Sequence, residues 1–365
     1  MPLFIDAHQD LAWNMQTYDR DYRRSVTETR RIEANTDIAE KNNGAATIGW
    51  QELQQAQTAI IFSTIFAPPV EHSEGVWDKL NYANTDEGNR IFHGQMDFYD
   101  QWAGESPDMF CHIRSRSELN AHLQTWREQP SDFPTTTHPV GLVWLLEGAE
   151  GIRTFADIED YWQRGLRIIG PVWAGFRFCG GTHSSGGFTE EGRELLKRMA
   201  KIGYILDISH MTEASALEAL DLYEGHIIAS HANCRVINGS SNERHFTDLT
   251  IKRLVQRGGV MGIIPYNRFL DSTWTQSDPR DRVTMKTMLR HLDHICQIAG
   301  SANHAAFGTD FDGGFGFPHI PLEMDTIADI QKMEPVLRDA GYTKLDIDAI
   351  FGGNWQRMLE VGLPA

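Results

Sequence analysis

Short apolar runs alternate with helical patterns along the chain, and this alternation limits the fold more than any other feature. The runs are 3–10, 59–67, 140–146, 166–172, 204–209, 226–230, 259–265 and 305–309. Helices are predicted at 50–57, 87–102, 117–127, 155–164, 190–202, 213–223, 249–257, 282–298, 326–340 and 344–363. Mostly apolar strands that alternate with helices indicate a parallel sheet covered by helices, and eight such units close a barrel. The predicted fold class is therefore α/β, a (β/α)8 TIM barrel.

A doubly wound sheet is the alternative, and it is less favoured because no G-x-G-x-x-G motif follows an early strand and opens a helix. The length of 365 residues suits one large barrel. We predict a single domain over residues 1–365, with a polar insertion at about 19–57 and outer C-terminal helices at about 326–363.

The composition limits which partners the protein is expected to bind and where in the cell it is expected to lie. The chain is 41% hydrophobic and 23% charged, which is typical of a soluble globular protein. No apolar run approaches the ~20 residues of a membrane-spanning helix, and no basic start leads into an apolar signal segment. A net charge of -17 would repel a phosphate backbone. We therefore expect a cytoplasmic protein that binds neither nucleic acid nor membranes.

Six histidines and acidic residues stand at the carboxyl ends of five predicted strands. They are His8 and Asp10 after the first run, Glu147 after the third, His210 after the fifth, His231 after the sixth and Asp310 after the eighth. A single residue of this kind often only caps a loop. In a β/α barrel, however, the carboxyl ends of the strands converge on one catalytic face, so these side chains are expected to meet.

Three imidazoles and three carboxylates exceed the needs of one tetrahedral metal, because a catalytic zinc typically takes three protein ligands. Two cations ~3.5 to 4 Å apart can share a bridging carboxylate and a bridging hydroxide, whose pKa falls to roughly 7. Glu147 is the predicted bridge. Nitrogen and oxygen ligands without thiolate suit zinc, with manganese, cobalt or iron as alternatives. The predicted cofactor is thus two divalent metal ions, preferably zinc.

The strand-end residues lie within a series of short motifs that extends over nearly the whole chain. The motifs are DAHQDL at 6–11, LEG at 146–148, LDISH at 206–210, SH at 230–231, FGTDFDG at 307–313 and GGN at 352–354. In this order and at these spacings they resemble the renal (membrane) dipeptidase family of metallopeptidases, within the amidohydrolase superfamily.

The resemblance implies a barrel of the metal-dependent hydrolase type with two zinc ions. By motif match, His8 and Asp10 would hold one metal, His210 and His231 the other, and Glu147 would bridge them. Asp310 would be the general acid and base, while the bridging hydroxide attacks the amide carbonyl of a small-molecule substrate. Family members cleave dipeptides, often with a D-residue at the C-terminal position, and the resemblance suggests a homodimer.

The resemblance also marks residues for substrate binding, with one departure. Arg244 falls where the family keeps an arginine that grips the substrate carboxylate, a task that suits a guanidinium fork. The family usually has a histidine that contacts the scissile carbonyl, and Trp173 stands there instead. An indole donates one hydrogen bond but carries neither a proton nor a charge. Arg177 and His183, in the following loop, are candidates to replace it.

The predicted function is a metal-dependent dipeptidase. Because of Trp173, a related amidohydrolase that acts on an N-acyl amino acid, another non-peptide amide or a lactone is one alternative. A non-catalytic metal-binding barrel is the other, and Asp310 argues against it because a binding protein needs no proton shuttle.

Overall fold

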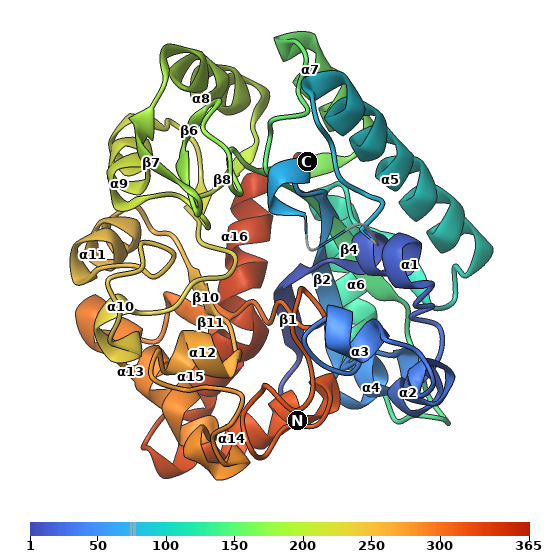
Figure 1. Ribbon diagram of the computed structural model, residues 1–365. Coiled ribbons are helices and arrows are strands. Elements are labelled where there is room, and N and C mark those ends of the chain that lie inside the picture. The colour runs from blue at the N-terminus through green and yellow to red at the C-terminus, as the bar shows by residue number, and fades with distance from the viewer. Residues whose placement is uncertain (74, 76–77) are drawn as a thin grey trace.

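The computed structural model describes residues 1–73, 75 and 78–365. In this part of the chain, eight parallel strands form the barrel predicted from the sequence (Figure 1). They are β1 (Phe4–Gln9), β2 (Thr58–Phe66), β4 (Val140–Glu147), β5 (Leu166–Gly170), β8 (Ile205–Asp207), β9 (Ile227–Ile228), β10 (Met261–Ile263) and β11 (Ala305–Phe307).

Two further backbone contacts close the barrel where the regular pairing of strands is interrupted. Strands β1, β2, β4, β5, β8 and β9 pair in that order, and β10 pairs with β11. A parallel bridge between Ala229 and Met261 joins β9 to β10. At the other interruption, the backbone nitrogen of Asp310 donates to the carbonyl oxygen of His8 at 3.0 Å, so the segment after β11 returns to β1. The chain thereby brings residues from its first ten and its last sixty positions together.

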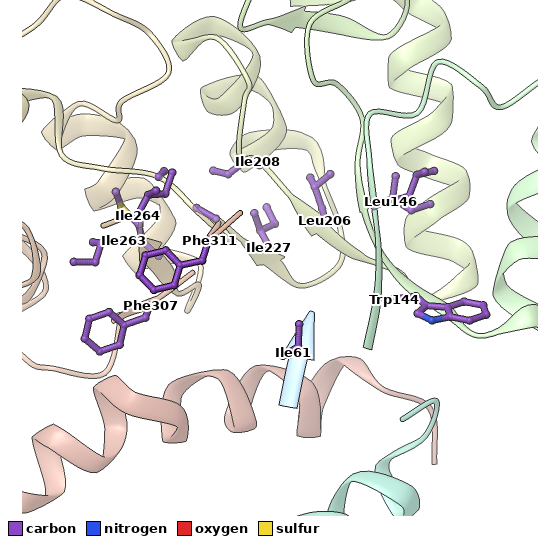
Figure 2. Close-up of a cluster of buried hydrophobic side chains, with 14 of the residues drawn as sticks. Ile61, Trp144, Leu146, Leu206, Ile208, Ile227, Ile263, Ile264, Phe307 and Phe311 are labelled. Carbon is purple, nitrogen blue, oxygen red and sulfur yellow. The ribbon is translucent and has the colours of Figure 1, made fainter. Parts of the chain in front are cut away.

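Strand residues are buried on both faces, as a barrel wrapped in helices requires. Every residue of β1, β2 and β4 is buried. Along β4, Val143 and Leu145 belong to one apolar cluster, whereas Trp144 and Leu146 belong to a larger one. Figure 2 shows part of the larger cluster, where Leu146, Leu206 and Ile227 come from three different strands. This two-sided burial explains why the strands are continuous apolar runs instead of alternating patterns.

Helices connect and cover these strands. They are α1 (Leu11–Tyr18), α2 (Val26–Glu33), α3 (Ile38–Lys41), α4 (Trp50–Gln55), η1 (Val70–His72), α5 (Thr85–Glu105), α6 (Arg116–Glu128), α7 (Phe155–Arg164), α8 (Glu190–Ile202), α9 (Glu213–Leu222), α10 (Arg235–Asn238), α11 (Asp248–Gln256), α12 (Asn267–Leu270), η2 (Arg280–Arg282), α13 (Met285–Ala299), η3 (Ile327–Lys332), α14 (Met333–Asp339), α15 (Lys344–Asp348), η4 (Ala349–Gly353) and α16 (Asn354–Gly362). Local sequence sets several ends. For example, Ser115 and Glu118 form a capping box at the start of α6, and Gly165 ends α7 with a φ of 113°.

Three short strands lie outside the predicted set. Strand β3 (Phe110–His112) pairs with the first residues of β4. Strands β6 (Cys179–Gly181) and β7 (Ser184–Phe188) form an antiparallel hairpin in the Gly/Ser-rich stretch that we expected to be a loop. Runs this short carry little periodicity, so their strand conformation depends on the partner strand.

The stretch predicted as an insertion, residues 19–57, holds α2, α3 and α4 and contacts the segment after β11. Ala45 bridges Phe317, and Thr47 donates from its backbone nitrogen to Asp312 at 2.8 Å. The insertion thus supports the chain that carries Asp310. In the part of the chain that the structure describes, no helix has the length and apolar character needed to cross a bilayer.

Candidate metal centre and active site

The six strand-end residues lie together at one end of the barrel. Glu147 is at their centre, with its two carboxylate oxygens facing different histidines. Oε2 lies 3.4 Å from His8 Nε2, whereas Oε1 lies 2.9 Å from His210 Nε2 and 3.3 Å from His231 Nε2. This is the placement expected of a carboxylate that bridges two cations.

Two carboxylates complete the cluster on the side of His8. Its Nε2 atom lies 3.7 Å from Asp10 Oδ1 and 4.0 Å from Asp310 Oδ1. Two overlapping groups have ligand atoms within 4.8 Å of one another: His8 with Glu147 and His231, and His8 with Asp10 and Asp310. Buried imidazole nitrogens and carboxylate oxygens are donors suited to zinc and similar divalent metals, so the donor set fits the predicted cofactor.

Hydroxyl groups behind the ligands orient them. Ser230 donates its hydroxyl hydrogen to Asp207 and lies 2.7 Å from His231 Nδ1, so it accepts a hydrogen bond from that nitrogen. His231 Nε2 is then left with its lone pair turned toward Glu147. Thr182, in the turn between β6 and β7, lies 2.7 Å from His210 Nδ1. Such partners fix the tautomer and direction of a metal-binding histidine. The sequence did not point to Thr182, because its role depends on the unpredicted hairpin.

Burial and the crowding of carboxylates shift the pKa values of the groups in this cluster. Burial and the nearby charge of Glu147 raise the pKa of Asp10 to about 6. Burial also raises the pKa of Asp310 well above its usual value, and the charges of Asp10 and Glu147 add to this effect. Burial lowers the pKa of His210 to about 4, helped by the charge of Arg244. A divalent cation bound here would replace the positive charge that the carboxylates otherwise favour on His8, whose pKa they raise to about 10 against the effect of burial.

The backbone is strained at the centre. His210 has a φ of 67°, Asp310 of 53° and Asp312 of 65°, all in the left-handed region that side chains other than glycine rarely adopt. Strain of this kind costs roughly 1–3 kcal/mol per residue and clusters at functional sites. Gly313 is also required, because an added Cβ atom would lie 2.0 Å from Asp310 Oδ1 and 2.9 Å from Asp10 Oδ2.

A cavity of about 260 Å³ opens beside the centre. It is lined by Asp10, Trp13, Phe66, Pro68, His72, Asp78, Glu147, Trp173, Thr182, His210, Asn242, Arg244, Phe269, Asp310, Gly313 and Gly314. Four of the six metal and acid–base candidates, Asp10, Glu147, His210 and Asp310, therefore line the same cavity as Trp173 and Arg244.

Arg244 is the most unusual polar group in this cavity. The residue is 3% exposed, and in the part of the chain that the structure describes none of its three side-chain nitrogens has a hydrogen-bond partner. Burial lowers its pKa despite the nearby carboxylates of Asp310 and Glu147. Its guanidinium carbon lies 5.7 Å from the centre of the Phe269 ring. A buried cation without a partner lowers the stability of the folded protein unless an anionic group of a ligand pairs with it.

The other residues predicted to bind substrate differ in whether they line the cavity. Trp173 is at the cavity wall, with its ring 5.2 Å from that of Phe66. His183 stacks on His72 at 4.3 Å, and His72 lines the cavity. Arg177 does not line it: its guanidinium donates to the carbonyl oxygens of Glu150 and Ile152 and pairs with Glu191. Arg177 thus holds two loops together at a distance from the cavity wall.

Comparison with known proteins shows the family of the chain. Residues 1–361 match the family model of the membrane dipeptidases, peptidase family M19. An uncharacterised protein from the pqqA 5′ region of Klebsiella pneumoniae is 29% identical over 232 residues, which cover 60% of this chain and 82% of the relative. The dipeptidase tcpJ of Claviceps purpurea is 28% identical over 178 residues, which cover 47% of this chain but 38% of the fungal protein.

A solved structure shares the fold. It is a metallopeptidase from Rhodobacter sphaeroides, liganded with a phosphinate mimic of the dipeptide L-Ala-D-Ala. The TM-score is 0.77 at 20% sequence identity, with 99% of each chain covered. A barrel with histidines and carboxylates at its strand ends defines the class of metal-dependent hydrolases. Within that class, the chain belongs to the membrane dipeptidase family of metallopeptidases.

Proposed function

We propose that the protein hydrolyses the amide bond of a dipeptide with the help of two divalent metal ions. The observation that carries the proposal is the shared cavity, in which the histidine–carboxylate cluster lies beside the unpartnered guanidinium of Arg244. A dipeptide offers both an amide carbonyl for the cluster and a terminal carboxylate for the arginine.

The chain supplies two sets of metal ligands that share Glu147. His8 and Asp10 would hold one cation, and His210 and His231 the other. Divalent metal ions held by these residues would supply Lewis acidity, which would polarise the substrate carbonyl and make water nucleophilic at neutral pH.

Arg244 would bind and orient the substrate through its terminal carboxylate. A guanidinium fork can make two parallel hydrogen bonds to a carboxylate, and burial strengthens them because water does not compete. This contact fixes the C-terminal residue, so that the amide carbonyl lies over the cluster. We propose that this residue can be a D-amino acid, in line with the L-Ala-D-Ala mimic bound to the Rhodobacter sphaeroides relative.

Asp310 is placed to move the proton. It lines the cavity, and the backbone bond to His8 and the space left by Gly313 fix its position. Its raised pKa suits a carboxyl group that takes a proton from the attacking water and gives it to the leaving amine.

A related amidohydrolase activity on N-acyl amino acids is the second candidate. Trp173 favours it, because this indole cannot replace the proton-carrying histidine expected beside the scissile carbonyl. Both candidates use the same cluster and the same arginine, and they differ in the group on the acyl side.

The decisive experiment combines metal analysis with hydrolysis of a library of L-Xaa-L-Xaa and L-Xaa-D-Xaa dipeptides and N-acyl amino acids, before and after chelation. We expect about two metals per chain and cleavage of dipeptides that chelation abolishes and zinc restores. Turnover of N-acyl amino acids alone would favour the second candidate. Metal binding without any turnover would contradict both.

A further inference from the structure

The cavity has two chemically different sides. On one side, Trp13, Phe66 and Trp173 form a continuous aromatic wall, with ring centres 6.2 Å apart for the first pair and 5.2 Å apart for the second. Pro68 extends this apolar surface. On the other side lies the guanidinium of Arg244 with Asn242 and the ring of Phe269.

The order of the strands places these sides opposite each other. The aromatic wall comes from helix α1, which follows β1, from the end of β2 and from the loop after β5. Arg244 lies between β9 and β10, and Phe269 lies in α12, after β10. Figure 1 shows α1 on one side of the barrel and α10 and α12 on the other. Glu147, His210 and Asp310 of the histidine–carboxylate cluster line the same cavity, so both sides share it with the cluster.

This arrangement fixes the direction of the substrate, given the proposed function. With the terminal carboxylate on Arg244 and the amide carbonyl over the cluster, the acyl residue extends toward Trp13, Phe66 and Trp173. Its side chain therefore meets aromatic carbon, where burial of apolar area is favourable and burial of a charge is costly.

The side chains of Asp78 and His72, which line the cavity beside the aromatic wall, already have contacts within the protein. Asp78 is 2% exposed, and its Oδ1 atom accepts a hydrogen bond from the backbone nitrogen of Leu80 at 3.3 Å. His72 stacks on His183, with the rings 4.3 Å apart and 15° from parallel. These contacts hold the loops at the edge of the cavity and leave the aromatic rings as its main substrate-facing surface.

We propose that the aromatic wall selects substrates whose acyl residue has a large apolar side chain, and that Trp173 is the principal specificity-determining residue. The proposal rests on the proposed dipeptidase function and adds the substrate class. Trp173 then replaces contacts to the scissile carbonyl with apolar contacts to the side chain next to it.

The test is the kcat/KM of zinc-loaded enzyme for Leu-Ala, Phe-Ala, Ala-Ala, Asp-Ala and Lys-Ala, each with L- and D-alanine at the second position. An apolar contact of this kind discriminates by roughly 10- to 200-fold per group. We expect Leu-Ala and Phe-Ala to exceed Ala-Ala by about tenfold or more, and the charged substrates to be poorest. Preference for Lys-Ala would overturn the proposal and assign specificity to Asp78.

Substitutions at Trp173 and at neighbouring aromatic residues test which side chain causes the preference for a large apolar acyl residue. We expect Trp173→Ala to reduce the Leu-Ala to Ala-Ala ratio to within about threefold of unity, and Trp173→Phe to retain most of it. Phe176→Ala removes a neighbouring ring that is 51% exposed and does not line the cavity, so the ratio should not change. If Trp173→Ala fails to fold, Phe66→Leu tests the same wall and should also lower the ratio.

The outcomes separate the two proposals. Cleavage of all these dipeptides without preference, or an unchanged ratio in Trp173→Ala, overturns the aromatic specificity and leaves the dipeptidase function intact. Absence of zinc-dependent cleavage of every dipeptide overturns the function and the specificity together.

Discussion

The two ends of the barrel both contain a hollow, but they differ in how their polar groups are satisfied. The hollow at the amino-terminal end of the strands is larger, about 650 Å³ against about 260 Å³ at the carboxyl end. Its charged side chains have partners: Lys344 pairs with Asp348 at 2.7 Å, and Arg357 donates to the carbonyl oxygen of Asn303 at 2.6 Å. At the carboxyl end, the guanidinium of Arg244 has no hydrogen-bond partner among residues 1–73, 75 and 78–365.

The difference shows that volume does not mark the functional end. The carboxyl end carries crowded carboxylates, an unpartnered cation and residues such as His210 and Asp310 in the left-handed region. These features lower the stability of the ligand-free protein, and a bound ligand would supply the missing partners. At the amino-terminal end, other protein groups already pair with the charged side chains. Substitutions at the two ends should therefore have opposite consequences.

The largest difference in activity between substitutions at the two ends is expected for Asp310, the proposed general acid and base. Asp310→Asn should lower kcat by about 10²- to 10⁴-fold, because the amide cannot accept or return the proton. Metal content, measured by elemental analysis, should not change. Asp348→Asn at the amino-terminal end is the matched control and should keep full activity. Near wild-type turnover in Asp310→Asn would remove this residue from proton transfer.

Substitution of Arg244 should lower activity but increase the stability of the substrate-free protein. Arg244→Met should lower kcat/KM by about 30-fold or more, since loss of a buried charged partner costs about 2–5 kcal/mol. The same substitution should raise the free energy of unfolding of the substrate-free protein by about 1–3 kcal/mol, because it removes an unpaired buried charge.

The control for this prediction is Arg357→Met, measured by denaturant unfolding under the same conditions. Its guanidinium donates to backbone carbonyl groups, so its loss should lower the free energy of unfolding without affecting kcat/KM. Equal destabilisation by both substitutions would refute the contrast between the two ends.

The residues behind the ligands should affect metal affinity. Ser230→Ala removes the hydroxyl that lies between His231 and Asp207, and it should weaken metal binding by about 10- to 100-fold. Competition with a chromophoric chelator measures this change. Ser117→Ala, on the exposed start of α6, is the control. If both variants bind zinc as tightly as the wild type, Ser230 does not orient its histidine.

The smallest effect concerns Glu150, three residues after Glu147 and away from the cavity lining. Burial raises its pKa from 4.5 to about 7. The folded state thus binds this proton more tightly than the unfolded state, and its contribution to stability decreases as pH rises from about 4.5 to 7. Glu150→Gln should therefore be more stable than the wild type at pH 8, where the buried wild-type carboxyl is ionised.

Thermal unfolding at pH 5 and pH 8 measures this dependence. At pH 5 the wild-type carboxyl is protonated in the folded state, and the two proteins should unfold at nearly the same temperature. A constant difference across this pH range would mean that Glu150 ionises normally.

Much of the candidate site follows from local rules. The alternation of strands and helices predicted the barrel, and the position of a residue at a strand end predicted which side chains would meet. His8, Glu147 and His231 could be grouped in this way although more than two hundred residues separate the first from the last. The strand-end rule does not extend to loop residues such as Arg177, whose partners Glu150 and Glu191 lie on two other segments.

By itself, the sequence determined the element order, the buried strands and the residue types available to bind metal, because these depend on periodicity and on chemistry within a few residues. Only the tertiary structure decided that Thr182 and Ser230 orient the histidines, that Arg244 has no hydrogen-bond partner among the described residues, and that Trp13, Phe66 and Trp173 form one wall. Those properties are distances between side chains from different β/α units, and they are set by how the barrel closes and its loops pack.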